Sequence, residues 1–284
     1  MHHQAQKAAE LAGQQFRLPF SRQTWAGTQG DWAGRGTGNS IDFQDHRAYQ
    51  WGDDPRGIHW AAYARTEQLT MKQYRAELAP VVDVAVDVSG SMLFHPARAM
   101  QTIALLKFCV YSATKSGAQV QLWAVNGNQA HPVEKDAVHN NSWLENLPKS
   151  THESPPDWQL PWRPKGMKVI ISDLLYPGEP GMYLDPICAR GGSTIIYVPT
   201  LSEEAHCPGI GNFKLKDCES GKSMVRHISA SVAKRYAHAY ATHFEIWNEA
   251  CLRRQAIMAL IPCELELSKA LSVEALARGG VELN

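Results

Sequence analysis

The chain has 284 residues, of which 44% are hydrophobic and 20% charged, enough for one full domain of roughly 200 residues and an additional segment. Lysine plus arginine equals aspartate plus glutamate at 28 each, so no global field favours nucleic acid or a membrane surface as a partner. The sequence shows no apolar run of about 18 residues and no signal peptide, so we expect a cytoplasmic protein without a membrane span, whose six scattered cysteines are reduced thiols.

Residues 1–78 differ in composition from the rest and are expected to form an N-terminal segment packed on the main domain. A short helix is predicted near residues 4–12, and glycine- and aspartate-rich sequence with several tryptophans follows it. That stretch is too aromatic for a disordered linker and too rich in glycine for a plain helix. We interpret it as turns and short strands.

Residues 79–284 alternate between apolar runs typical of buried strands and amphipathic helical patterns. The predicted strands are 81–89, 119–125, a shorter one within 125–134, 167–175, 193–199, 211–217 and 256–262. The predicted helices are 96–117, 140–147, 181–190, 223–254 and 271–280. This alternation predicts an α/β fold, a doubly wound and mostly parallel sheet with helices on both faces and right-handed crossovers.

Two of the predicted strands end in an aspartate. Asp87 closes the first strand and opens the pattern Asp87-x-Ser89-x-Ser91, and Asp173 closes the strand in IISD. Ligands of such sheets bind outside the carboxyl ends of the strands, where the direction of winding reverses. A further aspartate, Asp83, lies inside the first strand and needs a partner that the sequence does not identify.

The Asp-x-Ser-x-Ser turn offers one carboxylate and two hydroxyls, all of them hard oxygen ligands. A small divalent cation such as Mg²⁺ takes oxygen ligands, and neutral hydroxyls leave it with residual positive charge that can capture a carboxylate from another molecule. Serine and aspartate before a helix are also ordinary N-cap residues. The local spacing leaves metal ligand and helix cap open as alternatives, and the second strand-end aspartate favours the metal.

These residues resemble the metal-ion-dependent adhesion site of a von Willebrand factor type A domain. The resemblance assigns Asp87, Ser89 and Ser91 to the family's motif, with Asp173 as its later acidic member. The family also uses a loop threonine. The intervening stretch LPKSTHESPPDW offers Thr151 or Ser154 for it, without the usual Gly-Thr context.

A second resemblance lies upstream. The run IDFQDHRAYQWGDDPRGIHWAAYARTEQLTMKQYRAE is very similar to the signature of the bacterial domain-of-unknown-function fifty-eight family, and the likeness covers nearly all of the chain after about residue 30. His59 departs from it, because the family usually has aspartate there. The signature includes the charged residues Arg47, Asp53, Asp54, Arg56 and Arg65. We interpret these five as an ion-pair and turn network that fastens the N-terminal segment, with a catalytic or docking surface as the alternative.

The resemblance implies a companion of a MoxR-type AAA+ ATPase, acting in chaperone-like maturation or a stress response. The expected role is a non-enzymatic interaction module that binds Mg²⁺, or Mn²⁺ or Ca²⁺, and an acidic side chain of a protein partner. No P-loop and no nucleophile elbow occurs in the sequence. The alternatives are a metal-dependent phosphoester hydrolase and a scaffold whose metal site has decayed.

Overall fold

The computed structural model describes residues 2–22, 41–76, 79–147, 154–218 and 221–284. The chain divides into two compact units, one formed by Met1–Thr24 with Pro80–Asn284 and the other by Trp25–Ala79. The expected boundary at residue 78 therefore needs correction at the amino terminus, because α1 (His2–Gln15) packs on α4 (Pro96–Lys115) of the larger unit. The packing of residues 25–78 on the main domain stays a prediction.

The described part of the smaller unit contains a strand pair and two short helical segments. Strands β2 (Ile41–Ala48) and β3 (Thr70–Ala76) pair antiparallel, with an irregularity between Phe43 and Asp45. Between them lie the 3₁₀ turn η2 (Pro55–Gly57) and helix α2 (Trp60–Thr66). The expectation of turns and short strands is thus confirmed for the described residues of this segment.

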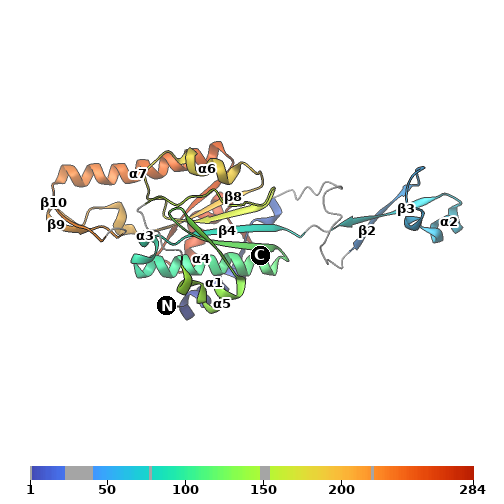
Figure 1. The fold of residues 1–284 in the computed structure, drawn as a ribbon, viewed down its shortest axis with the longest axis horizontal. Helices are drawn as coiled ribbons and strands as arrows, with labels where there is room; N and C mark the ends of the chain where they lie inside the picture. The colour runs from blue at the N-terminus through green and yellow to red at the C-terminus, as the bar shows by residue number, and fades with distance from the viewer. Residues whose placement is uncertain (1, 23–40, 77–78, 148–153, 219–220) are drawn as a thin grey trace. The chain divides into compact units, whose positions relative to one another are not determined.

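The larger unit is built on a six-stranded sheet of order β11-β8-β7-β4-β5-β6 (Figure 1). All neighbouring pairs are parallel except β5 with β6, which is an antiparallel hairpin at one edge. The strands are β4 (Val81–Asp87), β5 (Gln119–Asn126), β6 (Gln129–Val133), β7 (Met167–Ile171), β8 (Thr194–Thr200) and β11 (Ile257–Pro262). The predicted α/β doubly wound fold is confirmed.

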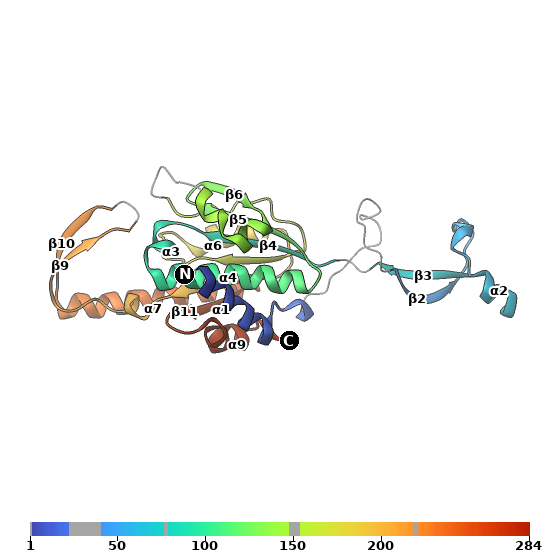
Figure 2. The same ribbon diagram turned by 90° about the horizontal axis from the view of Figure 1, so that it is seen from below.

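Helices cover both faces of this sheet (Figures 1 and 2). Helices α4 and α1 lie on one face, and α6 (Pro180–Cys188) and α7 (Ala230–Arg253) lie on the other. Contact between α1 and α4 is close, because a Cβ on Gly13 would come within 2.4 Å of the ring of Tyr111. The remaining segments are β1 (Phe16–Arg17), η1 (Phe20–Arg22), α3 (Gly90–Phe94), α5 (Lys135–Asn140), η3 (Ser142–Asn146), η4 (Ser202–Ala205), β9 (Gly211–Lys216), β10 (Ser223–Ile228), α8 (Leu267–Ala270), the π-helical turn η5 (Leu271–Ala275), α9 (Leu276–Arg278) and β12 (Glu282–Leu283).

Two predicted helices needed correction. The helix expected over 223–254 begins only at Ala230, because residues 223–228 form β10 and pair antiparallel with β9. The side chain of Ser229 accepts a hydrogen bond from the backbone N–H of Val232, which caps the helix start. The helix expected over 140–147 is the 3₁₀ turn η3, preceded by the helix α5 that the pattern did not predict.

The first strand of the sheet explains the aspartate inside it. β4 is buried from Val82 to Asp87, as expected for a β-branched run covered on both faces. Asp83 is 1% exposed and accepts hydrogen bonds from Arg163, at 2.8 Å from the backbone nitrogen and 2.6 Å from Nε. This ion pair supplies the partner that a buried carboxylate requires, so Asp83 belongs to the core rather than to the strand-end site.

Candidate functional site

The candidate site lies at the switch point of the sheet. From β4 the chain continues to β5 on one side and returns to β7 on the other, so β4 and β7 are the neighbours between which the winding reverses. Asp87 ends β4, and Asp173 follows β7 by two residues. Parallel strands place these two aspartates at the same edge, where ligands of doubly wound sheets bind.

Asp87 is the buried floor of the site, with 1% of its surface exposed. Its Oδ1 accepts a hydrogen bond from the backbone N–H of Ser89 at 2.9 Å, and its Oδ2 accepts one from the hydroxyl of Ser172 at 2.8 Å. Ser89 and Ser91 then bring their hydroxyl oxygens to 3.1 Å from each other. Ser89 precedes α3, but its side chain makes no capping hydrogen bond. Its hydroxyl therefore contacts the hydroxyl of Ser91 in the first turn of α3 and does not cap the helix backbone.

Asp173 is paired with a cation from the neighbouring helix. Its Oδ2 lies 3.1 Å from Nη1 of Arg98, and both side chains are 3% exposed. Its Oδ1 accepts a hydrogen bond from the backbone N–H of Leu175. Arg98 also contacts Glu204 and donates to the backbone oxygen of Ser91. One guanidinium thus joins the turn after β4, the end of β7 and the 3₁₀ turn η4.

Burial raises the pKa of two carboxyl groups near the site, Asp87 and Glu204. Burial, helped by the charge of Asp173, raises the pKa of Asp87 to about 7, although hydrogen bonds from Ser89 and Ser172 act in the opposite direction. Burial also raises the pKa of Glu204, and the charge of Arg98 limits that rise. Near neutral pH Asp87 is therefore present in both its protonated and its ionised form, and a bound cation would favour the ionised form.

A cleft of about 1340 Å³ opens above these groups. Ser89, Ser91, Arg98 and Asp173 line it, together with Glu204 and residues from several loops. Ser154, the alternative to Thr151 as the loop hydroxyl, also lines the cleft. Thr151 itself lies outside the described residues.

The donor set fits a hard divalent cation in chemistry. Two carboxylates and two hydroxyls supply oxygen only, and such a set leaves places for water or a further ligand. Within the described ranges, no three or more histidine, cysteine, aspartate or glutamate side chains gather as a metal-binding group. An ion here would therefore depend on the serine hydroxyls, and it would compete with Arg98 for Asp173.

The five charged signature residues lie in the smaller unit. Asp54 accepts a hydrogen bond from the backbone N–H of Arg56 at 3.0 Å and caps η2, and Asp53 accepts one from the backbone N–H of Gln50. Nε of Arg65 donates to a backbone oxygen within α2. Arg47 lies on β2. These contacts agree with the expected turn network, and the fastening of the segment to the main domain stays a prediction.

Three residues of the site were not singled out from the sequence. Ser172 directly precedes Asp173 in IISD, so its position at the end of the strand could have identified it as part of the site. Arg98 lies in the first turn of α4, and its burial depends on contacts with Asp173 and Glu204 that the helical pattern does not record. Glu204 carried no signal, because only the fold brings η4 to α4.

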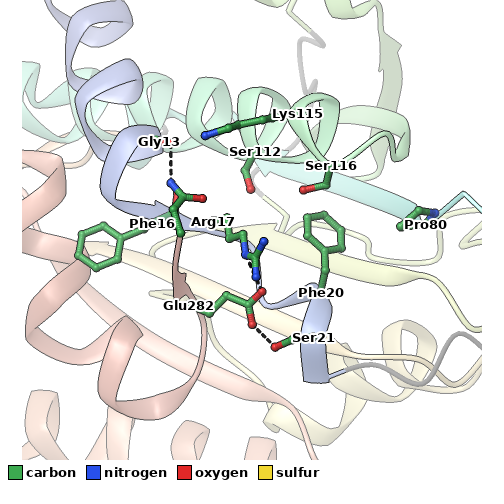
Figure 3. Close-up of a pocket in the computed structure, with 11 residues that line it drawn as sticks. Gly13, Phe16, Arg17, Phe20, Ser21, Pro80, Ser112, Lys115, Ser116 and Glu282 are labelled. Carbon is green, nitrogen blue, oxygen red and sulfur yellow. Dashed lines mark hydrogen bonds and ion pairs between the residues drawn. The ribbon is translucent and has the colours of Figure 1, made fainter.

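A second cavity, of about 440 Å³, lies where the two ends of the chain meet. Figure 3 shows Arg17, Glu282 and Ser21 pointing toward one another, next to the antiparallel pair of β1 with β12. Nε of Arg17 lies 2.8 Å from Glu282, and Ser21 donates to the same carboxylate. Arg17 and Ser21 thus pair with the carboxylate of Glu282, and we assign this cavity a structural role.

The fold and the cleft define a class: a doubly wound α/β protein with two carboxylates and two serine hydroxyls at its switch point. Within that class, the chain belongs to the family described as "Protein of unknown function DUF58", whose model matches residues 45–246. The resemblance to that family, inferred from the signature around residues 41–77, is confirmed.

Three proteins similar to the chain are described as uncharacterized. Proteins of Mycobacterium bovis and Mycobacterium tuberculosis are each 29% identical over 232 residues, which is 75% of this chain and 72% of the relative. Among solved structures, an aerotolerance-related membrane protein from Bacteroides fragilis aligns with 69% of this chain and 97% of its own, at 14% identity and a TM-score of 0.39. The BatB protein of Bacteroides thetaiotaomicron aligns with 68% and 98%, at 14% identity and a TM-score of 0.34. No helix in the described part of the chain is long and apolar enough to cross a membrane.

Proposed function

We propose that the chain is a non-enzymatic, metal-dependent protein-interaction module. In this proposal Asp87, Ser89, Ser91 and Asp173 hold Mg²⁺, or Mn²⁺ or Ca²⁺, and an acidic side chain of a protein partner completes the coordination. The observation that carries the proposal is the convergence of these four side chains at the switch point: Ser89, Ser91 and Asp173 line one cleft, and the buried Asp87 accepts a hydrogen bond from the backbone of Ser89. The ion would supply the positive charge that attracts the partner's carboxylate.

The chain's own residues divide the task. The backbone N–H of Ser89 and the hydroxyl of Ser172 orient the carboxylate of Asp87. Ser89 and Ser91 present neutral oxygens, so the site gains ligands without gaining negative charge. Arg98 holds Asp173 in place and screens its charge from Asp87. Ion and partner would each raise the affinity of the other by linkage.

The proposed partner rests on the sequence resemblance. Similarity to the von Willebrand factor type A domains that accompany MoxR-type AAA+ ATPases supports such an ATPase as the partner, in chaperone-like maturation or a stress response. A balanced net charge supports a protein rather than a nucleic acid partner. The cytoplasmic location that we propose rests instead on the six scattered cysteines, which are expected to be reduced thiols.

One observation favours a second candidate, a scaffold whose metal site has decayed. Arg98 already neutralises Asp173 in the described structure, with the two groups 3.1 Å apart. A permanent ion pair of this kind can take the place of a bound cation, as a buried charge requires a partner of some kind. The two candidates differ in whether the cleft binds a divalent ion.

Titration calorimetry of the chelator-treated protein with Mg²⁺, Mn²⁺ and Ca²⁺ separates them. We expect saturable binding that is lost in Asp87→Asn and kept in Asp136→Asn, an exposed aspartate on α5 that serves as the matched control. Circular dichroism of both variants checks that the fold is retained. Absence of binding in the wild-type protein would reject the metal-dependent module and leave the scaffold.

A further inference from the structure

The hairpin β9–β10 and the amino-terminal part of α7 form an extension of the larger unit. We call residues 211–244 the basic arm. In both ribbon views the hairpin and the first turns of α7 project beyond the sheet (Figures 1 and 2). Strands β9 and β10 pair only with each other among the described strands. Each therefore presents an outer edge of unpaired backbone groups.

The helical part of the arm has an apolar side that is only partly covered. In α7 the buried side chains begin at Phe244, so the turns before it bury none. Val232, Tyr236 and Tyr240 nevertheless recur at a spacing of four residues on these turns, and the side chain of Tyr236 is 43% exposed. Helices of globular proteins usually bury such a stripe against the core. Here the covering is partial: Tyr240 packs against the core and the hydroxyl of Tyr236 donates to the backbone oxygen of Glu204, while the turns nearer the hairpin bury no side chain fully.

Charge sets the arm apart from the rest of the chain. Residues 211–244 contain six lysines and arginines but two acidic residues, a net charge of +4 in a chain whose total is zero. Five of these cations are exposed and form no ion pair with any described residue: Lys214, Lys216, Arg226, Lys234 and Arg235. A surface of this kind attracts a partner of negative charge.

Strand β9 alternates apolar and basic side chains, with Phe213 and Leu215 on one face and Lys214 and Lys216 on the other. Lys214 lies opposite Val225 on one face, and Leu215 lies opposite Met224 on the other. The side chains of Met224 and Val225 are 52% and 71% exposed. A strand added to the hairpin would place alternate side chains on its basic face and its apolar face. A segment in which acidic and apolar residues alternate would therefore match both faces.

Lysines on edge strands also serve to prevent unwanted strand pairing. That role does not account for Lys234 and Arg235, because they lie on a helix, where no strand edge needs protection. The cations continue across both elements of the arm. A shared ligand explains this continuity better than separate protection of one hairpin.

We infer that the basic arm is a docking surface for an extended acidic segment of a partner protein, with apolar side chains at alternate positions. The segment pairs with an edge of the hairpin and places its carboxylates near the lysines and arginines. Exposed apolar side chains among the cations favour a peptide over a nucleic acid, whose backbone would leave them uncovered. This surface requires no metal and goes beyond the function proposed for the cleft.

The full chain can be tested with a fluorescein-labelled peptide of alternating glutamate and valine. We expect saturable binding by fluorescence anisotropy in the presence of a chelator, with an affinity that falls as salt rises. Reversing two charges on the hairpin, with Lys214→Glu and Lys216→Glu together, should weaken binding about tenfold. The pair Lys234→Glu and Arg235→Glu should do the same. Lys234 and Arg235 are exposed, so we expect this second pair of substitutions to keep the fold.

The matched control is Lys135→Glu with Lys269→Glu, which changes the net charge equally at exposed sites outside the arm. Equal weakening in this control would overturn the inference, as would the absence of saturable binding to the wild-type chain. Tighter binding of double-stranded DNA or phosphatidylglycerol vesicles, lost in the same arm variants, would also overturn it. Asp87→Asn should bind the peptide normally, so failure of the cleft proposal and failure of the arm are distinguishable.

Discussion

Arg98 and Asp173 form a buried ion pair across the cleft, with Nη1 and Oδ2 3.1 Å apart and both side chains 3% exposed. The pair connects the start of α4 to the end of β7, 75 residues later in the chain. A guanidinium in this position has two consequences. It stabilises a carboxylate that would otherwise be buried without a partner, and it occupies the place where a metal ion would draw on the same carboxylate.

Replacing Arg98 should therefore lower stability and raise the response to metal. In Arg98→Met we expect the free energy of unfolding to fall by about 3 kcal/mol or more, because Asp173 is left buried and unpaired. Added Mg²⁺ should then raise the Tm of the variant more than that of the wild-type protein, since the ion now supplies the missing charge. Thermal unfolding with and without Mg²⁺ measures both effects.

The control for this variant is Arg253→Met, which removes an exposed pair with Glu249 on α7. Its expected change is below about 1 kcal/mol, with no altered response to Mg²⁺. If Arg98→Met responds to Mg²⁺ no more than the wild type does, then Arg98 and the ion do not compete for Asp173.

The raised pKa of Asp87 predicts a specific dependence of stability on pH. In the folded chain the carboxyl keeps its proton up to about pH 7, whereas in the unfolded chain it loses it near the ordinary value of 3.8. The folded state therefore binds more protons in this window. The stability that protonated Asp87 contributes is fully present below about pH 4 and is lost as the pH rises through about 7.

Asp87→Asn should remove this contribution to the slope, because the amide does not titrate. Relative to the wild-type protein, we expect the variant to gain stability as the pH rises from about 4 to about 7, by an amount on the order of 4 kcal/mol at most. Denaturant unfolding in a chelator at several pH values measures the difference. Parallel pH profiles for the two proteins would show that Asp87 is ionised at its ordinary pKa in the folded state.

The same proton links pH to the affinity for metal. A carboxylate ligand must be deprotonated to bind a cation, so binding of Mg²⁺ should release a proton and strengthen as the pH rises through about 7. Calorimetry in buffers of different ionisation enthalpy detects the released proton. Affinity that is constant between pH 6 and 8 would contradict a role for Asp87 as a titrating ligand.

The sheet and the strand-end carboxylates could be predicted from the sequence because both depend on local patterns. Buried β-branched runs marked β4, β7, β8 and β11. Asp87 and Asp173 stood out because each interrupts such a run at its carboxyl end. Because β4 and β7 are parallel neighbours in the sheet, their carboxyl ends lie side by side.

What could not be predicted depends on contacts between distant segments. Met224 and Ile228 are spaced as on a helix, but pairing with β9 makes residues 223–228 a strand. The periodicity of a short segment cannot decide between these states, and the tertiary contact does. Glu204 meets Arg98 across 106 residues of sequence, and no local pattern records such a pair.

Arg163 should matter for stability and not for the cleft. It holds the buried carboxylate of Asp83 through its backbone nitrogen and Nε, while its own side chain is 26% exposed. In Arg163→Met we expect a loss of about 2–3 kcal/mol, at the lower end for a buried pair because solvent reaches the arginine. Denaturant unfolding gives the loss, and calorimetry should show unchanged binding of Mg²⁺. Weaker metal binding in this variant would indicate that loss of the Arg163–Asp83 pair also displaces Asp87 at the end of β4.

Ser229 should control the order of the basic arm without affecting the core. Its hydroxyl accepts the backbone N–H of Val232 at the start of α7, and the following turns bury no side chain. Loss of this cap in Ser229→Ala costs about 1 kcal/mol of helix stability. Because the turns before Phe244 bury no side chain fully, the loss should appear there as local opening and leave global unfolding nearly unchanged. Amide hydrogen exchange should accelerate in residues 230–240 and stay constant in residues 244–253, next to Trp247 in the core. Uniform acceleration along the whole helix would mean that α7 opens as one unit with the sheet.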